Sequence, residues 1–152
     1  MSASPAPGPR THSCKKLDSS RCCSAAVEEY MKISTFEEIK AWQGARILTG
    51  LVYEVTYSAK FKKDYGLSSQ IQRAAVSIMA NVAEGFERRS KNAFIQFLNY
   101  ASASNAELQS HLYVALDQDY IRQEEFQAIY NKSKEVGRLI NGFIAYFKKE
   151  SS

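Results

Sequence analysis

Apolar residues recur at intervals of three and four from residue 35 almost to the end of the chain, a spacing typical of amphipathic helices. Thr35 and Glu38 form a capping-box pattern, so we expect a first helix from about Thr35 to Lys60. No segment alternates with a period of two, and no proline follows Pro9. The pattern therefore predicts an all-α fold.

Three further helices are predicted, each with start or stop signals along the chain. Charge and glycine in segment 62–67 end the first helix. The other expected boundaries are a cap at Ser68 or Ser69, an end near Gly85, a cap at Ser90, a break at Asp117 and a start near Gln123. Because the connections are short, consecutive helices are expected to run antiparallel in an up-down four-helix bundle.

The chain divides into a leader, residues 1–33, and a bundle domain, residues 34–150. The leader is rich in proline and serine, shows no periodicity and lacks the apolar core of a secretory signal, so we expect it to be disordered. Two interpretations stay open: the leader is native, or translation starts naturally at Met31 and the leader does not belong to the native protein.

Composition favours a globular cytoplasmic protein. Hydrophobic residues make up 45% of the chain and charged residues 24%, which argues against disorder throughout. No stretch reaches the ~20 apolar residues that span a bilayer, so no membrane contact is expected. Cys14, Cys22 and Cys23 all lie in the leader, and their odd number and spacing fit neither a disulfide framework nor a metal site. A reducing cytoplasm is the expected compartment.

A polar stripe runs along the second predicted helix. Its members lie four, four, three and four residues apart, on one face: Arg73, Ser77, Asn81, Glu84 and Arg88. One interpretation is a surface that grips a phosphate backbone or a partner subunit through the arginines. The other is an internal network, in which Arg73 or Asn81 pairs with Glu107 and Glu84 caps a neighbouring helix end.

Basic residues cluster at both ends of the expected bundle, and the net charge of +4 permits an anionic partner without requiring one. Acidic residues between the third and fourth helices should neutralise the cluster at Lys60, Lys62 and Lys63. The candidate nucleic-acid-binding residues are Arg73, Arg88, Arg89, Lys91, Lys148 and Lys149. A monomer should bind weakly and in a salt-sensitive way, whereas a ring would repeat the patch and raise avidity.

Groups that would support catalysis are sparse in the bundle. His111 is its one histidine and has no cysteine or second histidine nearby. Glu107 and His111 stand alone, whereas di-iron bundles need paired Glu-x-x-His motifs. There is no glycine-rich phosphate loop. We therefore expect a protein that is not an enzyme and has no metal or cofactor.

The bundle has more aromatic residues than a four-helix core accommodates. The least easily buried are Tyr53, Tyr57, Tyr100 and Tyr113. Such surplus is commonly buried against copies of the same chain, which predicts a homo-oligomer.

Two segments carry a family resemblance: RAAVSIMANVAEGFERR at 73–89 and FIQFLNYASASNAELQSHL at 94–112. They resemble the four-helix bundle family of 23S rRNA intervening-sequence proteins, and the likeness extends over residues 36–149. The elements N-x-x-E-G and S-x-x-E-L occur together in the family's order. The residues that match the family's motif positions are Asn81, Glu84, Gly85, Ser104, Glu107 and Leu108, and those that match its basic positions are Arg73 and Arg88. Ser77 is expected to join the motif residues in one structural network.

The resemblance implies small up-down bundles that assemble as homopentameric rings. The family is also similar to the accessory variability determinant of diversity-generating retroelements, a pentamer that binds nucleic acid and a reverse transcriptase. Three positions depart from the family: Met79 replaces a proline, which should leave the helix straighter, and Ala103 and Asp119 replace glycines.

Two functional hypotheses remain open. The first is a non-enzymatic, oligomeric protein that binds RNA or DNA, with a reverse transcriptase as a further candidate partner. The alternative is a protein-interaction scaffold with no nucleic-acid role.

Overall fold

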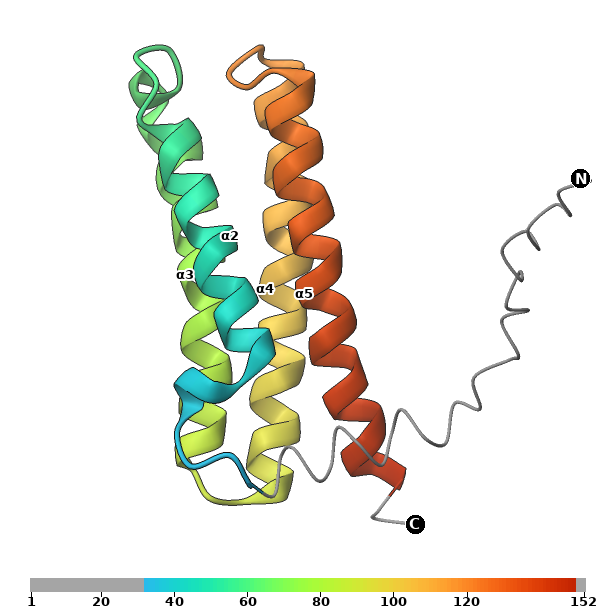
Figure 1. Ribbon diagram of the computed structural model, residues 1–152. Coiled ribbons are helices and arrows are strands. Elements are labelled where there is room, and N and C mark those ends of the chain that lie inside the picture. Colours follow the sequence, from blue (N-terminus) through green and yellow to red (C-terminus); the bar gives the residue numbers. More distant parts are fainter. Residues whose placement is uncertain (1–31, 150–152) are drawn as a thin grey trace, which may run out of the picture.

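A computed structural model describes residues 32–149 of the chain, and these residues form helices and no strand. The four long helices are α2 (Lys40–Thr56), α3 (Tyr65–Glu87), α4 (Lys91–Asp117) and α5 (Gln123–Lys149). Two short 3-10 turns, η1 (Phe36–Glu38) and η2 (Phe61–Lys63), precede α2 and α3. Figure 1 shows the long helices side by side as a bundle. The predicted all-α, four-helix fold is confirmed.

The helices pack as a closed square: α3 lies between α2 and α4, and α5 closes the square against α4 and α2. The two connections at one end touch, because Lys60 Nζ donates to the Asp119 carbonyl at 3.0 Å and the rings of Phe61 and Tyr120 stack with centroids 5.0 Å apart. At the other end, the Phe94 ring at the start of α4 lies 5.6 Å from that of Phe147 near the end of α5.

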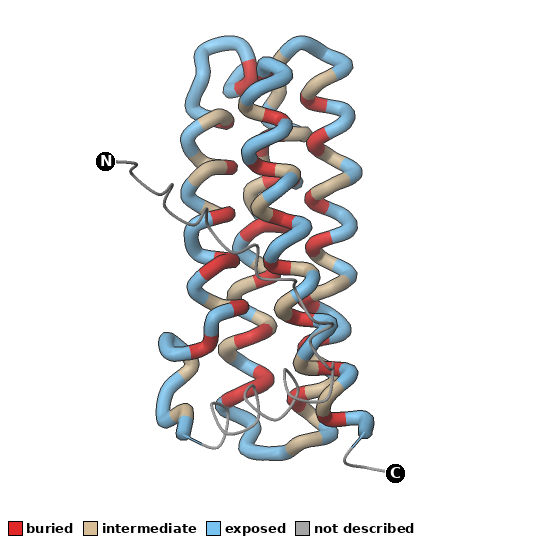
Figure 2. Tube along the Cα trace, turned by 45° about the vertical axis from the view of Figure 1, so that its right-hand side comes forward, coloured by how far each residue is buried: buried red, intermediate tan, exposed pale blue. Residues whose placement is uncertain are grey.

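The core consists of the predicted apolar stripes. Figure 2 shows buried residues recurring along the inner sides of the helices. The largest fully enclosed side chains include Phe61, Phe94, Leu48, Ile78, Leu108 and Ile140. At about 25 cal/mol per Å² of apolar area removed from water, this burial is the main stabilising contribution to the fold.

The first helix was predicted to begin too early and to end too late. Thr35 makes no side-chain capping bond, and the Glu38 carboxylate accepts from the Ser34 N–H at 2.8 Å instead. Ile39 then leaves the helical conformation, with ψ at 118°, so that α2 begins only at Lys40. The edge-to-face contact of Phe36 with Trp42, with ring centroids 5.2 Å apart, holds η1 against α2. The helix ends at Thr56 rather than Lys60.

The predicted start of the second helix was also wrong. Asp64, and not Ser68 or Ser69, caps α3, because its carboxylate accepts from the Leu67 N–H at 3.0 Å. Gly66 lies within the first turn of α3 and ends nothing. The cap at Ser90 is confirmed by its bond from the Ala93 N–H, and the break at Asp117 is confirmed by the end of α4.

A left-handed residue ends α4. Asp119 has φ of 56°, and the N–H groups of Asp119 and Tyr120 donate to the carbonyls of Leu116 and Ala115. These two bonds form a Schellman motif, in which glycine is the favoured residue at the left-handed position.

Replacing Asp119 by glycine is expected to raise the free energy of unfolding by about 0.5–1 kcal/mol, because glycine adopts the left-handed conformation without steric cost. Asp119→Ala is the matched control and should show no gain, since alanine keeps the Cβ. Urea denaturation of the three proteins at one concentration measures the difference. A glycine variant less stable than the parent would contradict this account of the turn.

The predictions for the leader and for its three cysteines fall on residues 1–31, which lie outside the described residues. Ile33, which was assigned to the leader, packs against the core. None of the helices between residues 32 and 149 combines the length and the hydropathy of a membrane-spanning segment.

Candidate nucleic-acid interface

The polar stripe of α3 lies along its seam with α4, and the two helices are joined there by a hydroxyl pair. The Oγ atoms of Ser77 and Ser104 are 2.9 Å apart. Asn81 Nδ2 donates to the Ser77 carbonyl at 2.8 Å and to the Ser77 Oγ at 3.1 Å. Because Ser77 Oγ accepts from Asn81, its own proton is available to Ser104. Three motif residues thus form one half-buried network.

Gly85 brings the two helices together near the end of the same seam. A Cβ at this position would lie 2.6 Å from the Cβ of Phe97 and 3.0 Å from the Phe94 ring. Cβ atoms do not approach this closely, so the spacing of α3 and α4 depends on the absence of a side chain here.

The other predicted partners in this network were wrong. Among the described residues, neither Arg73 nor Asn81 bonds to Glu107, whose Oε1 lies 3.3 Å from His111 Nε2 on its own helix. Arg73 and Glu107 line the same cavity of about 230 Å³ without pairing across it. Glu84 caps no helix end, because it pairs with Arg88.

Both arginines at the end of α3, Arg88 of the stripe and the adjacent Arg89, have a carboxylate neighbour. Arg88 Nη2 lies 2.6 Å from Glu84 Oε1, and the two side chains are 57% and 52% exposed. Arg89 Nη2 lies 3.7 Å from Glu87 Oε2. Each guanidinium also lies 5.4 Å from an aromatic ring centroid, Phe97 for Arg88 and Phe86 for Arg89. Exposed ion pairs contribute at most about 1 kcal/mol, so a phosphate can replace these carboxylates at little cost.

The remaining candidate cations lie at the same end of the bundle. Lys91 is the first residue of α4 and is half-buried. Lys148 and Lys149 are the last residues of α5 and are exposed. Since Phe147 contacts Phe94, this end brings together cations from α3, α4 and α5. Arg73 lies apart from them, exposed on the middle of the bundle.

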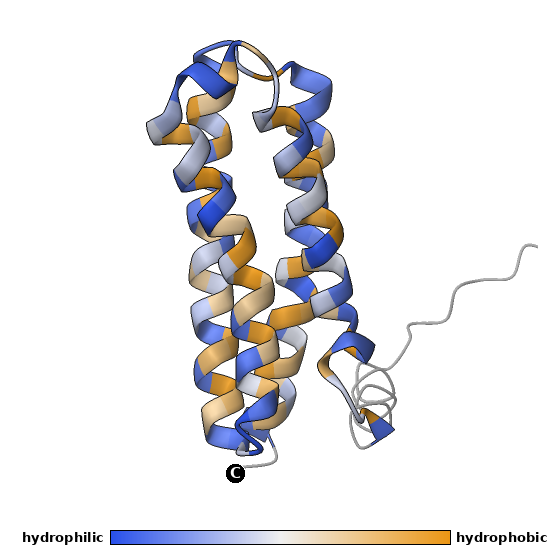
Figure 3. Cartoon of the chain, turned by 90° about the vertical axis from the view of Figure 1, so that its left-hand side faces the viewer, coloured by the Kyte–Doolittle hydropathy of each residue, from blue (hydrophilic) through white to orange (hydrophobic). Residues whose placement is uncertain are grey.

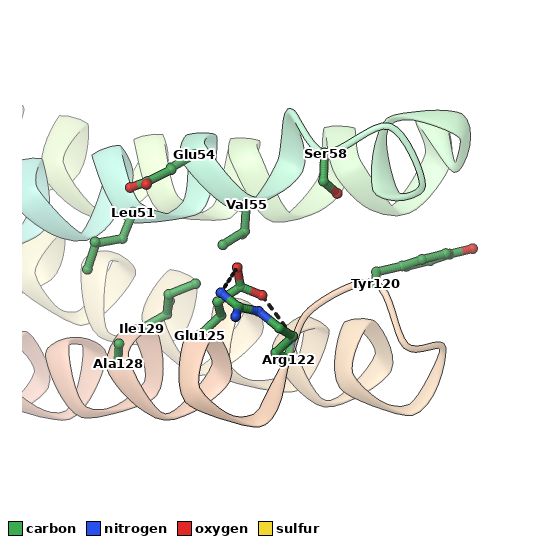
Figure 4. Close-up of a pocket in the computed structure, with 9 residues that line it drawn as sticks. All are labelled: Leu51, Glu54, Val55, Ser58, Tyr120, Arg122, Glu125, Ala128 and Ile129. Carbon is green, nitrogen blue, oxygen red and sulfur yellow. Dashed lines mark hydrogen bonds and ion pairs between the residues drawn. The ribbon is translucent and has the colours of Figure 1, made fainter.

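A second cavity, of about 280 Å³, lies between α2 and α5 and was not anticipated (Figure 4). Its lining residues are Leu51, Glu54, Val55, Ser58, Tyr120, Arg122, Glu125, Ala128 and Ile129. Arg122 Nη2 lies 3.1 Å from Glu125 Oε1, and the Arg122 N–H donates to Glu125 Oε2 at 2.8 Å. These two bonds hold the pKa of Glu125 below its usual value, so the carboxylate stays charged near neutral pH. The sequence carried no signal for this cavity, because its apolar members follow the ordinary core spacing.

No group of three or more histidine, cysteine, aspartate and glutamate residues that could hold a metal occurs within residues 32–149.

The chain is similar to known proteins over most of the bundle. A family model described as 23S rRNA-intervening sequence protein matches residues 37–142, which include both the α3 and the α4 motifs. A crystal structure of a protein of unknown function, from the S23 ribosomal protein family of Bacteroides thetaiotaomicron, is similar over 68% of this chain and 97% of its own. The two share 27% sequence identity, with a TM-score of 0.63. No curated protein matches the chain.

Proposed function

Since this chain belongs to the 23S rRNA-intervening sequence protein family, we propose that it is a non-enzymatic cytoplasmic protein that binds RNA or DNA as a homo-oligomer. The supporting observation is the row of arginines beside the α3–α4 seam. Arg73 and Arg88 lie fifteen positions apart on one helix face, or about 22 Å at about 1.5 Å per residue. That span suits several successive phosphates. Ser77 and Asn81 between the arginines are neutral, and the one carboxylate of the stripe, Glu84, forms an exposed ion pair with Arg88 that a phosphate can replace.

Reversing the charge at Arg88 and Arg89 together, with glutamate at both, is expected to weaken binding to a structured RNA at least about tenfold, because phosphate contacts dominate such affinity. Lys134→Glu combined with Arg138→Glu is the matched control, since it changes the net charge equally and both residues are exposed on α5, which does not pack against α3. Gel-shift titration with structured RNA and with duplex DNA measures both affinities. Equal affinities for the double variant and the control would show that Arg88 and Arg89 do not contact phosphates.

Self-association is the second part of the proposal. Each chain forms an antiparallel up-down bundle, and the bundles join as a ring. The family resemblance implies five copies in the ring. The outer side of α4 supports it, because α4 has no charged residue between Lys91 and Glu107. Tyr100, which lies within this uncharged stretch, is nearly half exposed. An uncharged helix face with exposed aromatic residues is typical of an interface core.

Introducing a charge at Ala103, an exposed residue of this neutral face, tests the ring. Ala103→Glu is expected to shift the native mass from an oligomer to the monomer, because a desolvated, unpaired carboxylate is costly in an interface. Asn141→Glu places the same charge on the exposed side of α5 and should leave the oligomer unchanged. Native mass spectrometry reads out both. A monomeric parent protein, or an Ala103→Glu oligomer of the parent's mass, would refute the α4 interface.

The alternative function is a protein-interaction scaffold with no nucleic-acid role. The same neutral face of α4 favours it, since such a face accepts a foreign helix as readily as a copy of itself. An intact oligomer that binds neither RNA nor DNA would favour this alternative.

A further inference from the structure

A cleft of about 340 Å³ opens between α2 and α3, on the opposite side of Arg73 and Ser77 from α4. Figure 3 faces this side. Tyr53 lines it from α2, and the residues that line it from α3 are Ser69, Gln72, Arg73, Val76 and Ser77. Arg73 therefore lies between two cavities, this cleft and the smaller one that it shares with Glu107.

The cleft gathers hydrogen-bond donors that have no partner. Within residues 32–149, no hydrogen bond or ion pair involves the Arg73 guanidinium, the Ser69 hydroxyl or the Tyr53 hydroxyl. Gln72 is already engaged, since its Nε2 donates to Thr56 Oγ1 at 2.7 Å. No carboxylate lines the cleft. One cation and two free hydroxyls, without an acid among them, form an environment suited to an anion with several acceptor oxygens.

Arg73 differs in this respect from the arginines at the end of α3. Arg88 and Arg89 each have a carboxylate within 4 Å. Arg73 shares only the smaller cavity with an acid, Glu107, and forms no ion pair with it. A phosphate at Arg73 has no carboxylate to displace. The guanidinium can also donate two parallel bonds to one phosphate, which a lysine cannot.

Exposed tyrosines lie next to the cleft. The Tyr57 ring is 6.4 Å from that of Tyr53 and is 67% exposed. Tyr65, one helical turn before Ser69, is 80% exposed. Aromatic platforms beside a cation bind unpaired nucleic-acid strands, because every base offers a face for stacking. The bases of a duplex are already stacked on one another and cannot use such a platform.

We infer that this cleft binds a phosphodiester of a single-stranded nucleic acid, with Arg73, Ser69 and Tyr53 donating to the phosphate and Tyr57 stacking on an adjacent base. The inference rests on the proposed function and deepens it, because it assigns Arg73 a phosphate of its own in this cleft and gives this part of the arginine row a preference for single strands. An acidic peptide is the competing occupant, since it also offers anionic oxygens, but it gives Tyr57 no base to stack on.

The experiment compares full-length parent protein with Arg73→Gln, Tyr57→Ser and the control Arg138→Gln, because all three side chains are exposed. The probes are an oligouridylate, a blunt-ended RNA duplex of equal length and a polyglutamate peptide, each measured by fluorescence anisotropy. Arg73→Gln and Tyr57→Ser are each expected to weaken oligouridylate binding about tenfold, with the control within about twofold. Tyr57→Ser should leave duplex binding unchanged, and polyglutamate should bind none of the proteins. Unchanged circular dichroism verifies folding.

The outcomes separate this inference from the proposed function. If Arg73→Gln and Tyr57→Ser bind oligouridylate like the control while the double charge reversal at Arg88 and Arg89 loses affinity, the function stands and the cleft is not a strand site. If the parent protein binds no nucleic acid, both fall. Polyglutamate binding that Arg73→Gln abolishes would assign the cleft to an acidic peptide and overturn the inference.

Discussion

Replacing Phe94 by alanine is expected to lower the free energy of unfolding by about 3–5 kcal/mol, the largest effect of any change considered. Phe94 is 1% exposed at the start of α4, and its ring lies among those of Phe86, Phe143 and Phe147, with centroids 5.6–6.3 Å away. Truncation removes the apolar side chain and leaves a cavity that rigid neighbouring rings fill poorly. The result would loosen the end of the bundle that carries Arg88, Arg89 and Lys91.

Urea denaturation at a single protein concentration measures this loss, because the stability of an oligomer depends on concentration. Tyr65→Ala is the control, since Tyr65 is 80% exposed and surface truncations usually change stability by less than about 0.5 kcal/mol. A loss below about 1 kcal/mol at Phe94 would mean that this aromatic cluster is not part of a packed core.

Gly85→Ala is expected to destabilise the protein by about 1–3 kcal/mol, against the usual effect of this substitution. Alanine is favoured over glycine inside an exposed helix by about 1 kcal/mol. At Gly85 the new methyl group would meet the Phe97 Cβ at 2.6 Å, so α3 and α4 would have to move apart. Such a shift would also lengthen the 2.9 Å contact between Ser77 and Ser104 along the same seam.

Gly142→Ala provides the matched control, because a Cβ there meets nothing within 4 Å. It should stabilise the protein by up to about 1 kcal/mol. The opposite signs of the two substitutions are the informative result. If Gly85→Ala also stabilises the protein, then the spacing of α3 and α4 does not depend on the absence of a side chain at Gly85.

The helices could be predicted from sequence because their apolar stripes are long and regular. Ser90 and Asp117 were correctly placed, since each coincides with a change in periodicity. The start of α2 was not, because Thr35 and Glu38 match a capping box, whereas Ile39 leaves the helical conformation and the Phe36 ring packs edge-to-face against that of Trp42. At α3, the cap at Asp64 was missed because Gly66, two residues later, was interpreted as part of a helix end.

The candidate site was predictable in its location but not in its pairing. Spacing alone placed Ser77, Asn81 and Glu84 on one face of a helix, and the structure aligns that face with Ser104 of α4. The partners depend on how closely the helices approach, which spacing does not give. At the short α3–α4 distance set by Gly85, small hydroxyls meet across the seam. The longer side chains of Glu84 and Glu107 turn to neighbours on their own helices.

The dependence of single-stranded RNA affinity on salt tests the central claim, that arginines of α3 contact phosphates, most directly. Between about 50 and 300 mM KCl, the logarithm of the association constant should fall linearly with the logarithm of salt concentration. Three phosphate contacts, at Arg73, Arg88 and Arg89, predict a slope of about −2 per bound protomer, from about −0.7 per contact on a single strand. An affinity that stays constant across this range would contradict the account.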